Sequence, residues 1–113
     1  MARPTLDDLV PLGAFEEQVA LALVHAEPEA FGMNVRREIE SRTGRDVAIG
    51  AVYATLDRLE SKGLITSERS SGQGPSRRVF HLTVLGVEAL RVTKRQREEL
   101  WRGVDLREVR GER

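Results

Sequence analysis

The chain has 113 residues, 40% of them hydrophobic and 32% charged, with 18 basic side chains balanced by 18 acidic ones and no cysteine. This length suits one domain, and the composition is that of a folded protein. The lack of cysteine excludes disulfides, thiolate metal sites and thiol nucleophiles. No apolar stretch approaches the roughly 20 residues that span a bilayer, and residues 1–12 lack a hydrophobic signal core, so we expect a cytoplasmic protein that does not enter the membrane.

The first predicted helix follows a short N-terminal segment, residues 1–12, in which Pro11 interrupts any continuous helix. Over residues 12–26 apolar side chains recur at three- and four-residue spacing, which predicts an amphipathic helix. Pro28 ends this helix, because proline cannot continue the hydrogen-bonding pattern.

Two further helices are predicted before any strand. One covers about residues 32–42 and is closed by Gly44, since glycine readily adopts the left-handed conformation of a helix end. The next covers about residues 50–62 and is stopped by Gly63. Its apolar stripe has the i, i+4, i+7 spacing of a face turned to the core, and consists of Val52, Leu56 and Leu59.

A hairpin and a final helix complete the chain. Residues 64–70 and 77–83 are predicted strands on either side of Ser-Gly-Gln-Gly-Pro-Ser, whose glycines and proline suit a hairpin tip. Thr83 is a plausible N-cap for a helix over about residues 84–102, which at ~1.5 Å per residue is nearly 30 Å long. The order of elements predicts a mainly α fold with a small β-hairpin. That fold is a winged helix-turn-helix over residues 13–83, followed by a C-terminal helix and a frayed tail over 84–113.

The third predicted helix and its surroundings carry the most specific pattern. Residues 49–65 read Ile-Gly-Ala-Val-Tyr-Ala-Thr-Leu-Asp-Arg-Leu-Glu-Ser-Lys-Gly-Leu-Ile. This run resembles the signature of the PadR family, in which a glycine and a tyrosine open the recognition helix before Leu-x-x-Leu-Glu-x-x-Gly-Leu. Downstream, the basic second strand and the Leu-Thr-x-x-Gly entry to the last helix also match, so the resemblance covers roughly residues 12–90. The matching residues are Gly50, Val52, Tyr53, Leu56, Leu59, Glu60, Gly63, Leu64, Ile65, Gly74, Arg77, Arg78, Phe80, Leu82, Thr83 and Gly86.

The resemblance implies a transcriptional regulator that binds double-stranded DNA in a sequence-specific way, with repression as its usual mode. The residues support the same site, because a helix with small side chains at its start can enter the major groove closely. The alternative for this helix is an exposed face with an incidental tyrosine. The DNA-contacting residues predicted on it are Gly50, Ala51, Tyr53, Ala54, Thr55, Arg58 and Lys62.

The predicted wing offers a second set of DNA contacts, because arginines at a hairpin commonly touch phosphates or the minor groove. Its members are Arg69, Gln73, Ser76, Arg77 and Arg78. The alternative is a charged edge that prevents strand-to-strand aggregation. Two positions depart from the family: Ala48-Ile49 replaces the usual Ser-Pro, so the helix lacks a side-chain N-cap, and Pro75-Ser76 removes one tip arginine. Modest affinity per monomer is therefore expected, and dimerisation gains importance.

The resemblance also implies a homodimer, in which the C-terminal helix packs against the partner's N-terminal segment. Polar residues throughout 93–99 give no heptad seam, so a coiled coil is not expected. Trp101, the single tryptophan, either stacks on a small aromatic effector or simply buries area at the interface. The apolar residues that suit this contact are Leu6, Leu9, Val10 and Leu12 at one end of the chain, and Leu100, Trp101, Val104 and Leu106 at the other.

The sequence also bears on two other classes of function. His25 and His81 have no carboxylate or nucleophile at catalytic spacing and form no recognisable metal site, so we expect neither an enzyme nor a bound metal or cofactor. A winged-helix protein-interaction module without DNA binding is the stronger rival, because the net charge is zero. Against it, residues 1–31 hold one basic and six acidic side chains, whereas residues 69–97 hold seven basic and one acidic.

Overall fold

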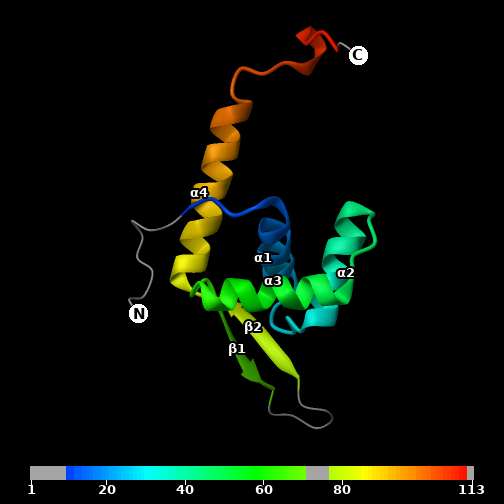
Figure 1. Cartoon of the computed structure of the whole chain (residues 1–113), viewed down its shortest axis with the longest axis vertical. Helices are drawn as coiled ribbons and strands as arrows, with labels where there is room; N and C mark the ends of the chain where they lie inside the picture. The colour runs from blue at the N-terminus through cyan, green and yellow to red at the C-terminus, as the bar shows by residue number, and fades with distance from the viewer. Residues whose placement is uncertain (1–9, 71–76, 112–113) are drawn as a thin grey trace.

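The computed structural model describes residues 10–70 and 77–111, which form helices around one hairpin (Figure 1). The elements are α1 (Ala14–Ala26), α2 (Gly32–Thr43), α3 (Ile49–Ser61), β1 (Ile65–Arg69), β2 (Arg78–Leu82), α4 (Val84–Trp101) and a 3-10 helix (Leu106–Glu108). The predicted order, helix–helix–helix–hairpin–helix, is confirmed, and so is the mainly α fold class. No described helix is long and apolar enough to cross a membrane.

The helix ends predicted at Gly44 and Gly63 and the N-cap predicted at Thr83 are confirmed. Gly44 ends α2 with a φ of 71°, and Gly63 follows α3 with a φ of 77°. The Thr83 hydroxyl accepts a hydrogen bond from the Gly86 N–H at 3.0 Å, which caps α4. Ala48 precedes α3 without a side-chain cap, as the departure from Ser-Pro predicts.

The core lies where α1, α2 and α3 cross behind the hairpin. Val52, Leu56 and Leu59 are all buried, which confirms the predicted inward stripe of α3. They join Leu23 of α1 and Phe80 of β2 in one continuous apolar cluster. This stripe fixes the rotation of α3 about its axis and therefore decides which of its residues face outward.

The hairpin is attached to the start of α2 as well as to its own partner strand. β1 and β2 are antiparallel, with Ile65 opposite Leu82 and Arg69 opposite Arg78. In addition, the Phe80 N–H donates to the Ala30 carbonyl at 3.0 Å. Ala30, which precedes α2, is thus bonded to β2. The hairpin is therefore held against the start of α2 as well as being connected to α3.

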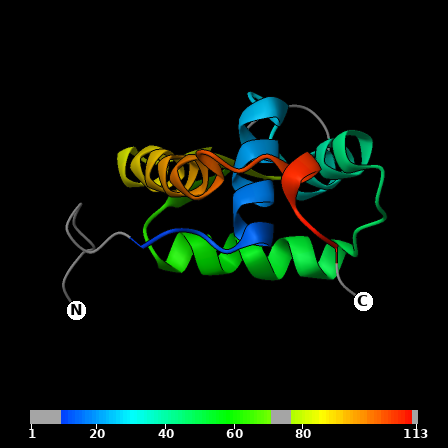
Figure 2. The same cartoon turned by 90° about the horizontal axis from the view of Figure 1, so that it is seen from above.

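α4 rises away from the other helices, and residues 10–13 pass beside it (Figures 1 and 2). The Leu12 N–H donates to the Thr93 hydroxyl at 2.9 Å, and that hydroxyl donates to the Ala89 carbonyl at 2.7 Å. Arg97 of α4 forms an ion pair with Glu17 of α1. The polar stretch 93–99 is helical throughout, because these contacts support its first half.

Candidate nucleic-acid interface

α3 presents small side chains on its outer surface. Gly50, Ala51 and Ala54 are exposed, and they lie along the first two turns of the helix. α3 runs along one side of the molecule, and the hairpin extends beyond it (Figures 1 and 2). A helix with so little side-chain bulk at its start can approach another surface closely.

The prediction that Thr55 lies on this outer surface is wrong. Its side chain is only 2% exposed, and its hydroxyl accepts a hydrogen bond from Arg58 Nη2 at 3.2 Å. The position lies three residues after Val52 and four before Leu59, so it belongs to the same inward stripe. The polarity of threonine suggested an outward side chain, but helical geometry places it inward.

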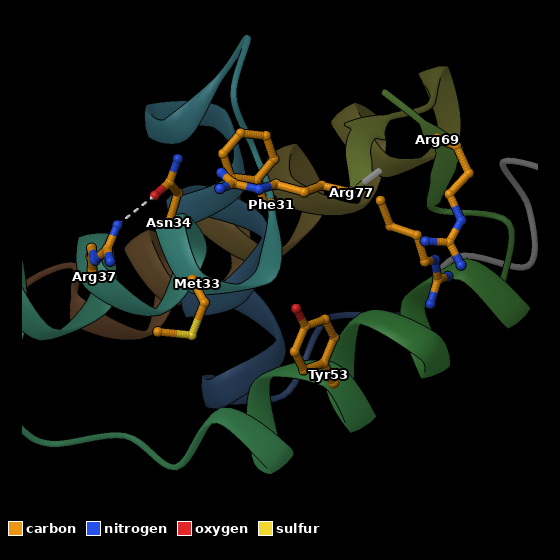
Figure 3. A pocket seen from close by; sticks show the side chains of 8 residues that line it. Phe31, Met33, Asn34, Arg37, Tyr53, Arg69 and Arg77 are labelled. Carbon is orange, nitrogen blue, oxygen red and sulfur yellow. Dashed lines mark hydrogen bonds between the residues drawn. The ribbon is translucent and has the colours of Figure 1, made fainter. Parts of the chain in front are cut away.

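Tyr53 lies on the exposed face of α3, and its ring covers the first residue of α2. A Cβ built on Gly32 would lie 2.4 Å from Tyr53 Cζ, so only a glycine leaves room for the ring in this position. The side chain is 37% exposed, and its hydroxyl points from α3 toward the start of α2 (Figure 3). Tyr53 therefore presents its polar end to solvent beside the α2 N-terminus.

A hollow of about 420 Å³ opens between α2, α3 and the hairpin (Figure 3). Its lining combines aromatic rings with arginines, and consists of Phe31, Met33, Asn34, Arg37, Tyr53, Arg69, Arg77 and Arg78. Four of these were predicted as site residues from α3 and the wing. The α2 residues were missed, because only the folded chain brings the start of α2 against the wing. The basic residues of the predicted second helix, Arg36, Arg37 and Arg42, were the signal available in the sequence.

The arginines of the hollow differ in how they are held. The Arg77 guanidinium lies 4.7 Å from the centre of the Phe31 ring, a cation–π contact that leaves its charge unneutralised. Arg78 donates to Glu60 Oε1 at 2.7 Å and to Asp57 Oδ1 at 3.3 Å. Arg69 has no carboxylate partner within the described ranges. Arg37 donates to the Asn34 side-chain oxygen at 3.0 Å and likewise has no carboxylate partner among the described residues. Arg37, Arg69 and Arg77 are therefore the cations of the hollow most available to an anion.

The start of α2 adds to the same electrostatic field. Phe31 occupies the N-cap and makes no side-chain cap, so the first N–H groups of the helix are not bound by a capping side chain. Unpaired N–H groups and the helix dipole favour an anion at this end. The hollow thus combines a helix N-terminus, a phenolic hydroxyl and available arginines, a set that suits a phosphate group.

The other flank of α3 carries Arg58 and Lys62, and Glu16 of α1 contacts both. Lys62 Nζ lies 2.7 Å from Glu16 Oε2, and Arg58 Nε lies 3.4 Å from the same oxygen. Partial burial opposes the charge of Glu16, but hydrogen bonds from Lys62 and the Gly13 N–H, with the charge of Lys62 and a contact from Arg58, hold its pKa below the ordinary value. These two predicted DNA contacts are therefore paired in the free protein.

The remaining predicted residues are not brought into one site. Gln73 and Ser76 of the hairpin tip, and Leu6 and Leu9 of the N-terminal segment, lie outside the described residues. Leu12 is half-buried beside Thr93, whereas Leu100 and Trp101 lie about two turns further along α4. Among the described residues, Leu12 therefore lies apart from Leu100 and Trp101 within one molecule.

Residues 20–92 match the Transcriptional regulator PadR-like family. The chain belongs to this family of transcriptional regulators. It is 41% identical over 88 residues to the transcriptional regulator Rv3488 of Mycobacterium tuberculosis, a match that covers 76% of this chain and 81% of that protein. The family match over residues 20–92 includes α2, α3, the hairpin and the first half of α4, so the chain is a DNA-binding regulator with a winged helix-turn-helix.

Two solved structures share this fold. A PadR family transcriptional regulator from Eggerthella lenta DSM 2243 superimposes with a TM-score of 0.63 at 28% identity, covering 75% of each chain. The complex structure of hsRosR-S4 gives a TM-score of 0.62 at 26% identity, covering 83% of this chain and 77% of that one.

Proposed function

We propose that this PadR-like regulator binds a double-stranded operator with α3 in the major groove and the hairpin on the flanking backbone. The observation that carries the proposal is the hollow at the start of α2. There Tyr53 of α3, Arg69 of β1 and Arg77, the residue before β2, share one space with an uncapped helix N-terminus. Convergence of these donors suits a backbone phosphate beside the groove that α3 enters.

The contacts divide into two kinds in this arrangement. The small residues Gly50, Ala51 and Ala54 let α3 approach base edges, while Tyr53 and Arg77 fix its position through phosphate. Arg58 and Lys62 reach the backbone on the opposite flank once DNA competes with Glu16. Because the wing arginines are few, one molecule provides a small number of phosphate contacts and two molecules are needed for firm binding.

A salt titration tests DNA binding and separates it from the rival function. Gel-shift affinity for a duplex that carries the promoter of an adjacent gene should fall steeply between about 50 and about 200 mM salt. A protein-interaction module would show no duplex affinity at any salt concentration. Arg77→Ala should weaken binding to this duplex, with a thermal melt to show that the variant is folded.

Homodimerisation through α4 is the second part of the proposal. Leu100 is 81% exposed and Trp101 is 55% exposed, and Val104 follows them on the same exposed end. Apolar side chains gathered at one end of a helix are typical of an interface. Multi-angle light scattering should give the mass of a dimer at tens of micromolar, and Trp101→Ala should shift the population toward monomer. A monomer at that concentration for the unaltered chain would contradict it.

Repression in the cytoplasm, with response to an aromatic effector, completes the proposal. A repressor must occupy its promoter, and the proposed DNA-contacting residues and the proposed dimer contact through α4 would together allow this. A planar aromatic compound stacked on Trp101 would act at the dimer contact. Since Trp101 is the only tryptophan in the sequence, quenching of its fluorescence reports such binding directly. Unchanged emission across a series of phenolic compounds would leave Trp101 with interface packing alone.

A further inference from the structure

Glu16 lies where the first turn of α1 meets the exposed flank of α3. Its side chain is 13% exposed, and its two oxygens are used differently. Oε1 accepts the Gly13 N–H at 3.0 Å, which caps α1. Oε2 accepts Lys62 Nζ at 2.7 Å and Arg58 Nε at 3.4 Å. One carboxylate oxygen thus faces two cations of the recognition helix.

Arg58 is the only basic residue between the two ends of α3, and Lys62 is its C-terminal flanking residue. Both side chains remain about half exposed while they contact Glu16, so they stay within reach of solvent and of a phosphate. The charge that α3 offers on this flank is therefore partly cancelled before any DNA arrives. In the described part of the wing, by contrast, Arg77 has an aromatic ring rather than a carboxylate as its neighbour.

We propose that Glu16 is a specificity-determining residue, which competes with backbone phosphates for Arg58 and Lys62 and so suppresses binding of α3 to DNA of arbitrary sequence. Non-specific affinity comes almost entirely from neutralising phosphates, so a cation already paired with a carboxylate contributes little to it. On an operator, where α3 seats fully in the groove, phosphates approach closely enough to exchange with Glu16. This inference rests on the proposed DNA-binding surface.

Glu16→Gln is a sharp test, because an amide oxygen can still accept the Gly13 N–H while the negative charge is removed. Its matched control is Glu17→Gln, which removes the neighbouring charge of α1 but breaks a pair with Arg97 on α4 instead. Binding to a mixed-sequence duplex of about 30 base pairs, roughly three helical turns, is followed by fluorescence anisotropy across a salt series. Thermal melting of each variant establishes that it is folded.

Glu16→Gln should bind the mixed-sequence duplex about three- to ten-fold more tightly at low salt, with a slope of log K against log salt steeper by up to about 0.9 per monomer, because one negative charge is removed. Glu17→Gln should match the unaltered protein. Adding Arg58→Gln and Lys62→Gln to Glu16→Gln should cancel the gain. Unchanged or weaker binding by folded Glu16→Gln, or a gain that survives the triple substitution, overturns the inference.

A second variant tests the inference without altering Glu16. In the otherwise unaltered protein, Arg58→Gln should flatten the salt slope on mixed-sequence DNA by less than Arg77→Gln does, because Glu16 already offsets part of the Arg58 charge. Arg77→Gln should flatten the slope by about 0.9. Equal flattening by both variants overturns the role of Glu16 and leaves the proposed function standing. No binding by the unaltered protein at any salt concentration overturns both.

Discussion

The ring of Tyr53 lies against Gly32 so closely that a Cβ at Gly32 would be 2.4 Å from Tyr53 Cζ. This contact joins the outer surface of α3 to the first residue of α2. The missing side chain is what lets the tyrosine lie over the helix start instead of standing free in solvent. The position of its hydroxyl is consequently set by a residue with no side chain of its own.

Gly32→Ala should therefore weaken DNA binding without unfolding the protein. The added methyl collides with the far end of a side chain that can rotate outward, so stability should stay within about 1 kcal/mol of the unaltered protein. Loss of the positioned hydroxyl should weaken duplex affinity by about ten-fold, the usual size of one good hydrogen bond. Thermal melting and anisotropy titration measure the two effects.

The folding control for this substitution is Gly50→Ala, because a Cβ at Gly50 would meet nothing within 4 Å. It should leave stability unchanged or raise it by up to about 1 kcal/mol, since alanine is the better helix former. If Gly32→Ala bound DNA normally, the ring position would have no part in binding.

The two faces of α3 should fail differently when truncated. Leu56 is fully buried, so Leu56→Ala should lower the free energy of unfolding by ~2–5 kcal/mol. Tyr53→Ala should melt close to the unaltered protein and lose DNA affinity, because its ring packs at the surface. Tyr53→Phe keeps the ring over Gly32 and isolates the hydroxyl. A Tyr53→Ala protein that binds normally, or one that unfolds, would refute this assignment of the site.

Local chemistry explains why the elements were predictable. Gly44 and Gly63 end helices through their own backbone freedom, and Thr83 caps α4 through a neighbour three residues away. The i, i+4, i+7 stripe predicted correctly which face of α3 is buried, and only the exposure of Thr55 was predicted wrongly. Its neighbours on the helix surface are apolar, and burial became acceptable because Arg58 supplies a donor to its hydroxyl.

The contacts missed from the sequence all depend on how elements cross. Glu16 lies 46 residues from Lys62 along the chain, and no spacing rule connects a first-turn carboxylate to another helix. The Tyr53–Gly32 contact and the Phe80–Ala30 hydrogen bond likewise need the packed arrangement of α2, α3 and β2. Sequence periodicity finds faces of helices, whereas the pairing of those faces is a property of the whole fold.

The neighbouring wing arginines Arg77 and Arg78 should prove unequal. Arg77→Ala should flatten the salt slope by about 0.9 per monomer and leave the melting temperature almost unchanged. Arg78→Ala removes the partner of Glu60 and Asp57, so it should also lower stability by up to about 1 kcal/mol. Parallel salt titrations and melts of the two variants decide the matter. If the two variants had the same salt slope and the same melting temperature, the ion pairs of Arg78 would influence neither DNA binding nor stability.

Glu16 should make the stability of the fold depend on pH in the acid range. Its pKa is lowered on folding, so its contribution is complete above the ordinary glutamate value of 4.5 and is lost as the pH falls through the folded pKa. The difference in melting temperature between the unaltered protein and Glu16→Gln should therefore shrink from about pH 6 to about pH 3. Lys62→Gln should reduce that pH dependence. A constant difference across this range would contradict the prediction.

Thr83 connects the start of α4 to the turn after α3. Its hydroxyl donates to the Gly63 carbonyl at 2.7 Å, and its N–H donates to the Leu64 carbonyl at 3.0 Å. Gly86 lies so near the same carbonyl of Leu64 that a Cβ there would be 2.0 Å away. α4 and α3 are consequently held in a fixed orientation relative to each other. In a symmetric pair the tilt between the two α4 helices would set the distance between half-sites, so a substitution far from DNA could alter which operator spacing is accepted.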